Sequence, residues 1–315
     1  MVQSASERSL GERLEAHVGR YLQKVWDWDA FPASRGYPEL ARAQMRYVGS
    51  GGSPKAGDAT TLTPQHFTCS LLYQEPGRYA AVHTHEIEEV FFVLEGRLTV
   101  SWDFDDELVD VVLGPGDALW NPPERAHGFR NDGPSPMTAQ FMVGHPKPML
   151  PAYKSHPSRG GAAPEFGQPL PSTSDPRVAE IRRHLIRASD VETRWLDLGG
   201  GSRLAHQPYV WPPAEGGVVT PARFSLEMLY LPPGACSPLY RHPHETAFMV
   251  WEGVLTVDFE EAGARASTRL AARDLVMAPA GQRFRLRNEG AAPMRAAVIM
   301  GTPTPASNFW SGGEA

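Results

Sequence analysis

EEVFFVLEGRLTV, residues 88–100, recurs later in the chain as ETAFMVWEGVLTV, residues 245–257. In both stretches two apolar runs rich in Phe, Val and Leu flank a central Glu-Gly pair. Such runs are typical of β-strands, and Glu-Gly suits a tight hairpin turn in which glycine adopts a positive φ. Each stretch therefore predicts two short antiparallel strands joined by a turn.

Two further blocks repeat at the same spacing. TPQHFTCSLLYQEPG (residues 63–77) matches TPARFSLEMLYLPPG (220–234), and RNDGPSPMTAQFMVGHPKP (130–148) matches RNEGAAPMRAAVIMGTPTP (287–305). All three pairs share one offset, 157 residues, as between Gly96 and Gly253. Chance does not supply three blocks in constant register, so the chain is predicted to contain one domain duplicated.

Each copy contains turn residues at short intervals. The chain has 30 Gly and 30 Pro, and GPGD (114–117) and NPPE (121–124) are typical turn sequences. Several short strands separated by turns at this spacing favour an all-β barrel or sandwich.

The composition excludes several classes of protein. The 315 residues are 41% hydrophobic and 21% charged, with a net charge of −6 and no dense basic run, which disfavours a nucleic-acid partner. No stretch approaches the roughly 18 apolar residues of a membrane span, and the first 17 residues lack the apolar core of a secretory signal. Two cysteines without a CxxC motif argue against a disulfide framework, so we expect a cytoplasmic protein.

Two helical segments are predicted outside the repeat. Near the N-terminus one helical face would carry Leu10, Leu14, Val18, Tyr21, Leu22, Val25 and Trp26. This helix would pack against a barrel or, as the alternative, form a dimer arm. The second helix is expected over residues 175–187, where Asp175-Pro176 provides a cap and first turn.

The predicted organisation has four parts. Residues 1–45 form an N-terminal helical segment, and residues 46–155 form the first barrel. Residues 156–205 are a connector that is rich in Pro, Ser and Gly and carries one helix, and residues 206–315 form the second barrel.

The first copy contains a set of metal-ligand residue types. It reads Gly77-x5-His83-x-His85-x3-Glu89-x6-Gly96, followed by Gly116-x5-Pro122-x-Glu124-x2-His127-x3-Asn131. His83 and His85 are two apart in a predicted strand, so both point to one face. Imidazole nitrogen and carboxylate oxygen bind first-row divalent metals at about 2.0–2.2 Å. An isolated His-x-His in a strand is more often a surface pair, so the full set matters.

This pair of motifs resembles the two conserved motifs of the cupin superfamily, and the resemblance covers both repeats. It implies two tandem cupin barrels of the double-stranded β-helix, or jelly-roll, type. It also implies a metal bound by His83, His85, Glu89 and His127. One departure is Glu124, which stands where the second copy keeps Gly281. Glu124 is expected to be a solvated turn residue or, alternatively, an acid at the pocket mouth.

The second copy provides an internal control. At the four matching positions it has Tyr240, His242, Thr246 and Phe284, while Gly77, Gly96, Pro122 and Asn131 are matched by Gly234, Gly253, Pro279 and Asn288. The fold therefore does not need the four ligands, and the second barrel is expected to lack this metal. We expect a buried, hydrogen-bonded His242 and a structural role for the second barrel in packing or dimerisation.

Strand alternation predicts the lining of the metal pocket. Phe91 has the parity of Glu89, Phe129 that of His127, and Tyr79 that of the two strand histidines. These rings would line a partly aromatic cavity suited to a planar organic substrate, or they are ordinary barrel core.

No nucleophile elbow, phosphate-binding glycine loop or dinucleotide fingerprint is visible, so any chemistry belongs to the metal. The resemblance favours an Fe(II)-dependent dioxygenase that uses O2 to cleave a small aromatic, hydroxy-acid or diketone substrate. The alternatives are a non-redox isomerase, lyase or hydrolase using Mn, Zn or Ni, and a non-catalytic small-molecule-binding protein. A homo-oligomer, most simply a dimer, is the default expectation for the assembly.

Overall fold

The computed structural model describes residues 8–306 and 309–310 and divides into two compact units. One unit is Val25–Asp190, and the other joins Met1–Lys24 to Val191–Ala315. The expected four-part division differs from this. Residues 25–45 and the connector up to residue 190 belong with the first barrel, whereas the segment before residue 25 belongs with the second. The parts of the expected segments at 1–7, 307–308 and 311–315 lie outside the described residues.

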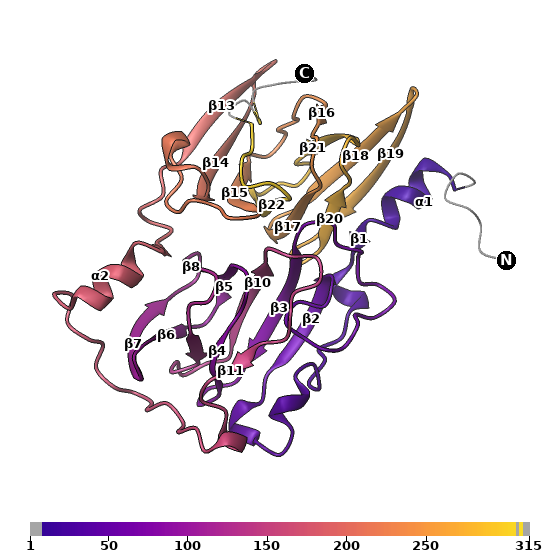
Figure 1. Ribbon diagram of the computed structural model, residues 1–315. Coiled ribbons are helices and arrows are strands. Elements are labelled where there is room, and N and C mark those ends of the chain that lie inside the picture. The colour runs from indigo at the N-terminus through magenta and orange to yellow at the C-terminus, as the bar shows by residue number, and fades with distance from the viewer. Residues whose placement is uncertain (1–7, 307–308, 311–315) are drawn as a thin grey trace. The chain divides into compact units, whose positions relative to one another are not determined.

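The first unit consists of two antiparallel sheets (Figure 1, indigo to rose). The six-stranded sheet has the order β12 (Leu185–Ile186), β8 (Ala118–Asn121), β5 (Glu89–Glu95), β10 (Met137–Val143), β3 (Thr68–Gln74) and β2 (Ala43–Val48). The five-stranded sheet has the order β11 (Ala152–Tyr153), β4 (Tyr79–Thr84), β9 (His127–Arg130), β6 (Leu98–Phe104) and β7 (Glu107–Leu113). Residues of both sheets, among them Phe91, Val100, Trp102 and Phe129, form one buried apolar cluster.

The second unit repeats this plan (Figure 1, rose to yellow). Its seven-stranded sheet has the order β1 (Val18–Gly19), β20 (Leu275–Ala278), β17 (Thr246–Glu252), β22 (Met294–Met300), β15 (Ser225–Leu231), β14 (Ser202–Val210) and β13 (Arg194–Gly199). Its four-stranded sheet has the order β16 (Tyr240–Arg241), β21 (Arg283–Arg287), β18 (Leu255–Glu261) and β19 (Ala264–Leu270). The predicted all-β fold with two barrels is confirmed.

Backbone constraints explain why the same Gly and Asn stand in both copies. Gly96 and Gly253 turn the two hairpins with φ of 78° and 75°, and a Cβ on either would lie 2.5 or 2.6 Å from a proline carbonyl oxygen. Asn131 donates to the carbonyl oxygens of Gln74 and Ser135, both at 2.9 Å. Asn288 makes the equivalent pair of bonds in the second copy. These residues fasten loops, which is a structural task that both barrels share.

The N-terminal helix is much shorter than predicted. Helix α1 spans Leu10–Glu15 and begins with a capping box between Ser9 and Glu12. Its Leu14 is buried in the core of the second unit, which agrees with the packing alternative. Val18–Gly19 then pairs with β20 as a strand, and Leu22 and Val25 are 93% and 71% exposed. The predicted continuous helical face was therefore wrong, because pairing with a distant strand overrides the local periodicity.

The connector helix was predicted correctly at its start and too long at its end. Helix α2 spans Pro176–Arg182, and the Asp175 side chain accepts a hydrogen bond from the Arg177 amide. Val178 and Ile181 of this helix are buried in the core of the first unit. Leu185–Ile186 leaves the helix to pair with β8. Five short 3₁₀ turns, 21–23, 32–34, 38–40, 157–159 and 213–215, complete the helical structure of the described residues.

Two sequence-based exclusions can be checked directly. Neither helix in the described part of the chain has the length and apolar character that a membrane crossing requires. Cys69 and Cys236 are both free thiols, as the absence of a disulfide framework predicts.

The turn at Glu124, where the first copy departs from the motif glycine, has a left-handed backbone. Glu124 has φ of 62°, its exposed side chain marks it as a turn residue, and Gly281 occupies the matching turn at 77°. Both amides donate 2.7 Å hydrogen bonds, to the carbonyl oxygens of His85 and His242. The left-handed conformation orients this amide towards the carbonyl oxygen. In a residue other than glycine this conformation is strained, because Cβ lies too close to the backbone.

Relieving this strain should stabilise the protein. We expect Glu124→Gly to raise the free energy of unfolding by about 1 kcal/mol, measured by urea denaturation. Gly281→Ala is the matched control and should lower it by a similar amount, because it introduces the same strain into the second barrel. A destabilised Glu124→Gly variant would show that the Glu124 side chain contributes more than its backbone costs.

Candidate metal centre

Three strands and one turn bring four buried ligand-type side chains together. His83 lies in β4, directly opposite His127 in β9. Glu89 begins β5, and His85 stands in the turn that follows β4. One ligand atom from each of the four lies within 4.8 Å of all the others. The sequence-predicted ligands are therefore neighbours in space.

Backbone carbonyl groups fix the orientation of two of the imidazoles. The Nδ1 atoms of His83 and His127 lie 2.8 Å from the carbonyl oxygens of Ala81 and Arg125, each two residues earlier in the chain. A carbonyl oxygen only accepts, so Nδ1 carries the proton in both rings. Each Nε2 then presents a lone pair, which is the form of histidine that binds a metal ion.

Glu89 is the only carboxylate among the four ligands. Its Oε2 lies 3.1 Å from Nε2 of His127 and 3.3 Å from Nε2 of His85. Burial alone would raise the pKa of Glu89, but the two imidazoles outweigh it and hold the pKa well below its usual range. The buried group is therefore a carboxylate anion that needs positive charge beside it.

The pKa values of His83 and His85 are shifted in opposite directions. Burial, with the neighbouring His127 and His85, lowers the pKa of His83 well below its ordinary value. Burial also acts to lower the pKa of His85, but the charge of Glu89 outweighs it, and that pKa is raised. Nδ1 of His85 is buried and has no hydrogen-bond partner among the described residues.

These observations fit a bound divalent cation. Three imidazole nitrogens and one carboxylate oxygen are a donor set for first-row metals such as Mn, Fe, Ni or Zn. A cation at the centre of the four atoms would neutralise Glu89 and would be bound by the lone pairs that the carbonyl groups orient. The same donor set leaves coordination positions for a further ligand.

A small cavity of about 30 Å³ lies against three of the four ligands, His83, His85 and Glu89. Its walls include three phenylalanines, Phe31, Phe129 and Phe141, together with the polar side chains of Arg42, Gln44 and Tyr153. A ligand of the metal would therefore be enclosed by apolar rings on one part of its surface and by hydrogen-bonding groups on another.

The three predicted pocket residues have three different positions. Phe129 lines the metal cavity as expected. Phe91 is not among the cavity-lining residues of the described chain: it packs 5.6 Å from the ring of His127 and stacks at 4.2 Å on Phe141. It supports the site from the core.

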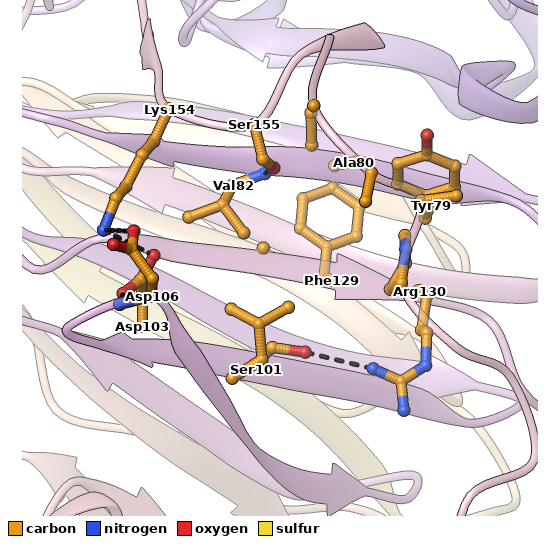
Figure 2. A pocket seen from close by; sticks show the side chains of 17 residues that line it. Tyr79, Ala80, Val82, Ser101, Asp103, Asp106, Phe129, Arg130, Lys154 and Ser155 are labelled. Atoms are coloured by element: carbon orange, nitrogen blue, oxygen red, sulfur yellow. Dashed lines mark hydrogen bonds and ion pairs between the residues drawn. The ribbon is translucent and has the colours of Figure 1, made fainter.

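Tyr79 lines a separate cavity of about 240 Å³ on the same barrel, so its predicted place beside the metal needs correction. Figure 2 shows this cavity, with Tyr79 near Phe129 and with Lys154 paired to Asp103 and Asp106. The cause is a bulge in β4: the register with β9 shifts between Ala80 and His83. One extra residue reverses the alternation, so Tyr79 and His83 point to opposite faces despite their equal parity.

Sequence reasoning missed the polar part of the cavity. Arg42 and Gln44 come from β2 and the residue before it, in the segment that was predicted to be helical. The sequence did contain a signal: Arg42, Gln44 and Arg46 alternate strictly with Ala43, Met45 and Tyr47. This period of two is typical of a strand, and it places the three polar residues on one face.

The second barrel has different contents at the matching positions. Tyr240 lies opposite Phe284 just as His83 lies opposite His127. The ring of Phe309 lies 3.8 Å from that of His242, and the Tyr240 hydroxyl donates to the Trp310 carbonyl oxygen at 2.9 Å. Phe309 and Trp310 thus pack against the residues of the second barrel that match the ligand positions of the first.

His242 is buried, as predicted, and its Nδ1 lies 3.3 Å from the Thr246 hydroxyl. Burial lowers the pKa of His242 to about 4. It is therefore neutral at pH 7 and suits an apolar core.

Comparison with known proteins agrees with this architecture. The model of the cupin domain family matches twice, at residues 70–144 and 227–300, each within one barrel. A search of curated proteins gave no match. The chain carries two cupin domains in tandem and belongs to the cupin superfamily.

Several solved structures share the two-barrel fold. Oxalate decarboxylase of Lactobacillus farciminis, in complex with formate, is 11% identical with a TM-score of 0.64, covering 91% of this chain and 86% of that one. Bacillus subtilis oxalate decarboxylase, which has Mn(II) centres, is 12% identical with a TM-score of 0.63, covering 92% and 78%. AerE from Microcystis aeruginosa is 14% identical with a TM-score of 0.52, covering 84% and 94%. At these identities the likeness shows the fold alone.

Removing one proposed ligand should release the metal. We expect His85→Ala to lose most of the metal that co-purifies with the wild type, while circular dichroism stays unchanged, because the second barrel folds without these ligands. His242→Ala, at the matching position of the second barrel, should keep the wild-type metal content. Elemental analysis measures both, and an unchanged content in His85→Ala would refute the assignment.

Restoring one histidine to the second barrel should not create a second site. Phe284→His leaves Tyr240 and Thr246 in place, and the Phe309 ring still lies against His242. We therefore expect the same metal-to-protein ratio as in the wild type, measured by elemental analysis after dialysis against Mn²⁺. A ratio raised by one would contradict the register between the two barrels.

Proposed function

We propose that this cupin is a metal-dependent enzyme that uses His83, His85, Glu89 and His127 to hold one divalent cation. The observation that carries the proposal is the cluster of four buried ligands, with two imidazoles oriented by backbone carbonyl groups. Such an arrangement costs stability unless a cation neutralises Glu89, and the second barrel folds without it.

The proposed reaction is oxygen-independent, as in a lyase, isomerase or hydrolase, and its metal would be Mn, Zn or Ni. When bound, the cation supplies Lewis acidity towards an oxygen-donor substrate. The chain's own residues hold it, and the phenylalanines of the small cavity exclude water from the substrate. The shared fold with oxalate decarboxylases, one of them with Mn(II) centres, supports this choice over a redox reaction.

A second candidate is the Fe(II)-dependent dioxygenase. The three phenylalanines that line the cavity support it, because an aromatic or diketone substrate would pack well against them. The ligand set serves either reaction, since metal choice depends on geometry and availability as well as on ligand type. Oxygen dependence separates the two candidates.

The deciding experiment starts from protein purified without chelators or a metal-binding tag. We expect about one Mn, Zn or Ni per chain, because only one barrel has the ligands. Substrate consumption should be equal in air and under nitrogen, abolished by EDTA and restored by the native metal. Iron as the native metal together with oxygen uptake would establish the dioxygenase instead. No bound metal, even after anaerobic reconstitution with Fe(II) or Mn(II), would overturn the proposal and leave a binding protein.

A further inference from the structure

Arg42 is a buried cation on the wall of the metal cavity. Its side chain comes from the residue before β2, is 5% exposed, and lines the cavity together with His83, His85 and Glu89. An arginine in this position is costly, because its guanidinium group has left water while keeping its charge. A buried guanidinium group is therefore expected to have an anionic partner.

The protein satisfies this side chain only in part. Nη1 of Arg42 donates to the Leu40 carbonyl oxygen at 3.0 Å and to the Ser34 hydroxyl at 3.2 Å, and the guanidinium group lies 4.1 Å from the centre of the Phe31 ring. The Tyr153 side chain, which lines the same cavity, also interacts with the guanidinium group. Nε is buried and has no hydrogen-bond partner among the described residues. These contacts hold the group in place without neutralising it.

Neighbouring arginines of the same barrel show the contrast. Arg46, four residues further on, pairs with Asp27 at 2.9 Å, and Arg130 pairs with Asp110 at 2.6 Å. Among the described residues Arg42 has no carboxylate within salt-bridge distance, whereas these two buried arginines have. Glu89 lines the same cavity and attracts Arg42 electrostatically, but no carboxylate forms a direct ion pair with it. A buried arginine without a direct ion pair on the wall of a ligand cavity indicates a binding position for an anionic ligand.

Gln44 extends the same polar wall. It follows Arg42 by two residues, so both side chains lie on one face of the strand, and both line the cavity. Its Nε2 donates to the Ser70 hydroxyl at 3.1 Å, while its buried Oε1 has no partner among the described residues. The wall thus offers an unused donor on Arg42 and an unused acceptor on Gln44.

We propose that Arg42 binds a carboxylate group of the substrate while another oxygen of the same molecule faces the metal. The substrate class is then a small dicarboxylic, hydroxy or oxo acid. The small size of the cavity and its charged wall favour an acid of few carbon atoms over a ring compound. This inference rests on the proposed function, and it adds the substrate class and the residue that selects it.

Binding of two probes tests the inference without requiring turnover. Oxalate is a dianion with two carboxylates, whereas acetohydroxamate chelates a metal as a monoanion and has no carboxylate for Arg42, so oxalate should depend on Arg42 much more strongly. Isothermal titration of Mn²⁺-loaded protein should give an oxalate Kd about 10- to 100-fold higher for Arg42→Met than for the wild type, as for loss of a hydrogen-bonded charge pair. The acetohydroxamate Kd should change less than about threefold. The oxalate Kd of Arg42→Lys should lie between those of the wild type and Arg42→Met, because lysine keeps the positive charge but lacks the planar guanidinium group.

Control variants separate direct binding by Arg42 from a general charge effect and from a folding defect. Arg97→Met removes an exposed arginine of the same barrel and should leave both affinities unchanged. Gln44→Glu keeps Arg42 but adds a negative charge to the wall, so it should weaken oxalate more than acetohydroxamate even if Arg42→Met folds poorly. Metal content is measured for every variant and should equal the wild-type value.

The possible results distinguish failure of the Arg42 inference from failure of the proposed metal centre. If Arg42→Met and Gln44→Glu have normal metal content and unchanged oxalate affinity, the proposed role of Arg42 is wrong. The metal-centre proposal is not affected by that result. Failure of wild-type protein to bind oxalate overturns it as well. If no variant or wild-type sample holds metal, the proposed function fails, and the same oxalate titration of metal-free protein decides whether Arg42 binds the anion by itself.

Discussion

The charge of Glu89 is the constraint on which the site depends. A carboxylate that is 6% exposed keeps its charge only where positive charge or hydrogen-bond donors surround it. Here Nε2 of His85 and Nε2 of His127 lie within 3.3 Å of one Glu89 oxygen, so a cation bound among these atoms would supply that positive charge. Those rings are in turn held by the register of β4 with β9, so the sheet geometry determines the charge balance of the cavity. A divalent cation would complete this balance.

The two barrels show how one scaffold serves different purposes. Both use a glycine hairpin and an asparagine that fastens two loops, and both place the same two strands opposite each other. In the first barrel the facing pair is His83 and His127; in the second it is Tyr240 and Phe284. The second barrel then fills its interior with Phe309 and Trp310 from the same unit. Interior packing there replaces the electrostatic arrangement of the first barrel.

The cavity beside the ligands divides into an apolar and a polar wall. The phenylalanine rings suit a dry pocket, where electrostatic interactions are stronger than in water. The polar wall comes from Arg42 and Gln44, and it lies outside the stretch of residues 70–144 that matches the cupin domain family. Family motifs point to the four candidate ligands because the chemistry of a metal ion restricts residue type. In our proposal, substrate recognition would depend on the less constrained segment before the domain.

The sequence alone determined the duplication, the all-β fold and the set of four ligands, because hairpin glycines, fastening asparagines and metal donors are each restricted to few residue types. It also marked the turn at Glu124, because the matching residue of the second copy is Gly281 and both have a positive φ. The tertiary structure decided the rest. Helix α1 ends early because Val18–Gly19 pairs with β20, and Tyr79 faces away from the ligands because β4 bulges against β9. Arg42 reaches the cavity because its segment pairs with β3. Strand pairing joins residues far apart in the chain, and local periodicity carries no information about such partners.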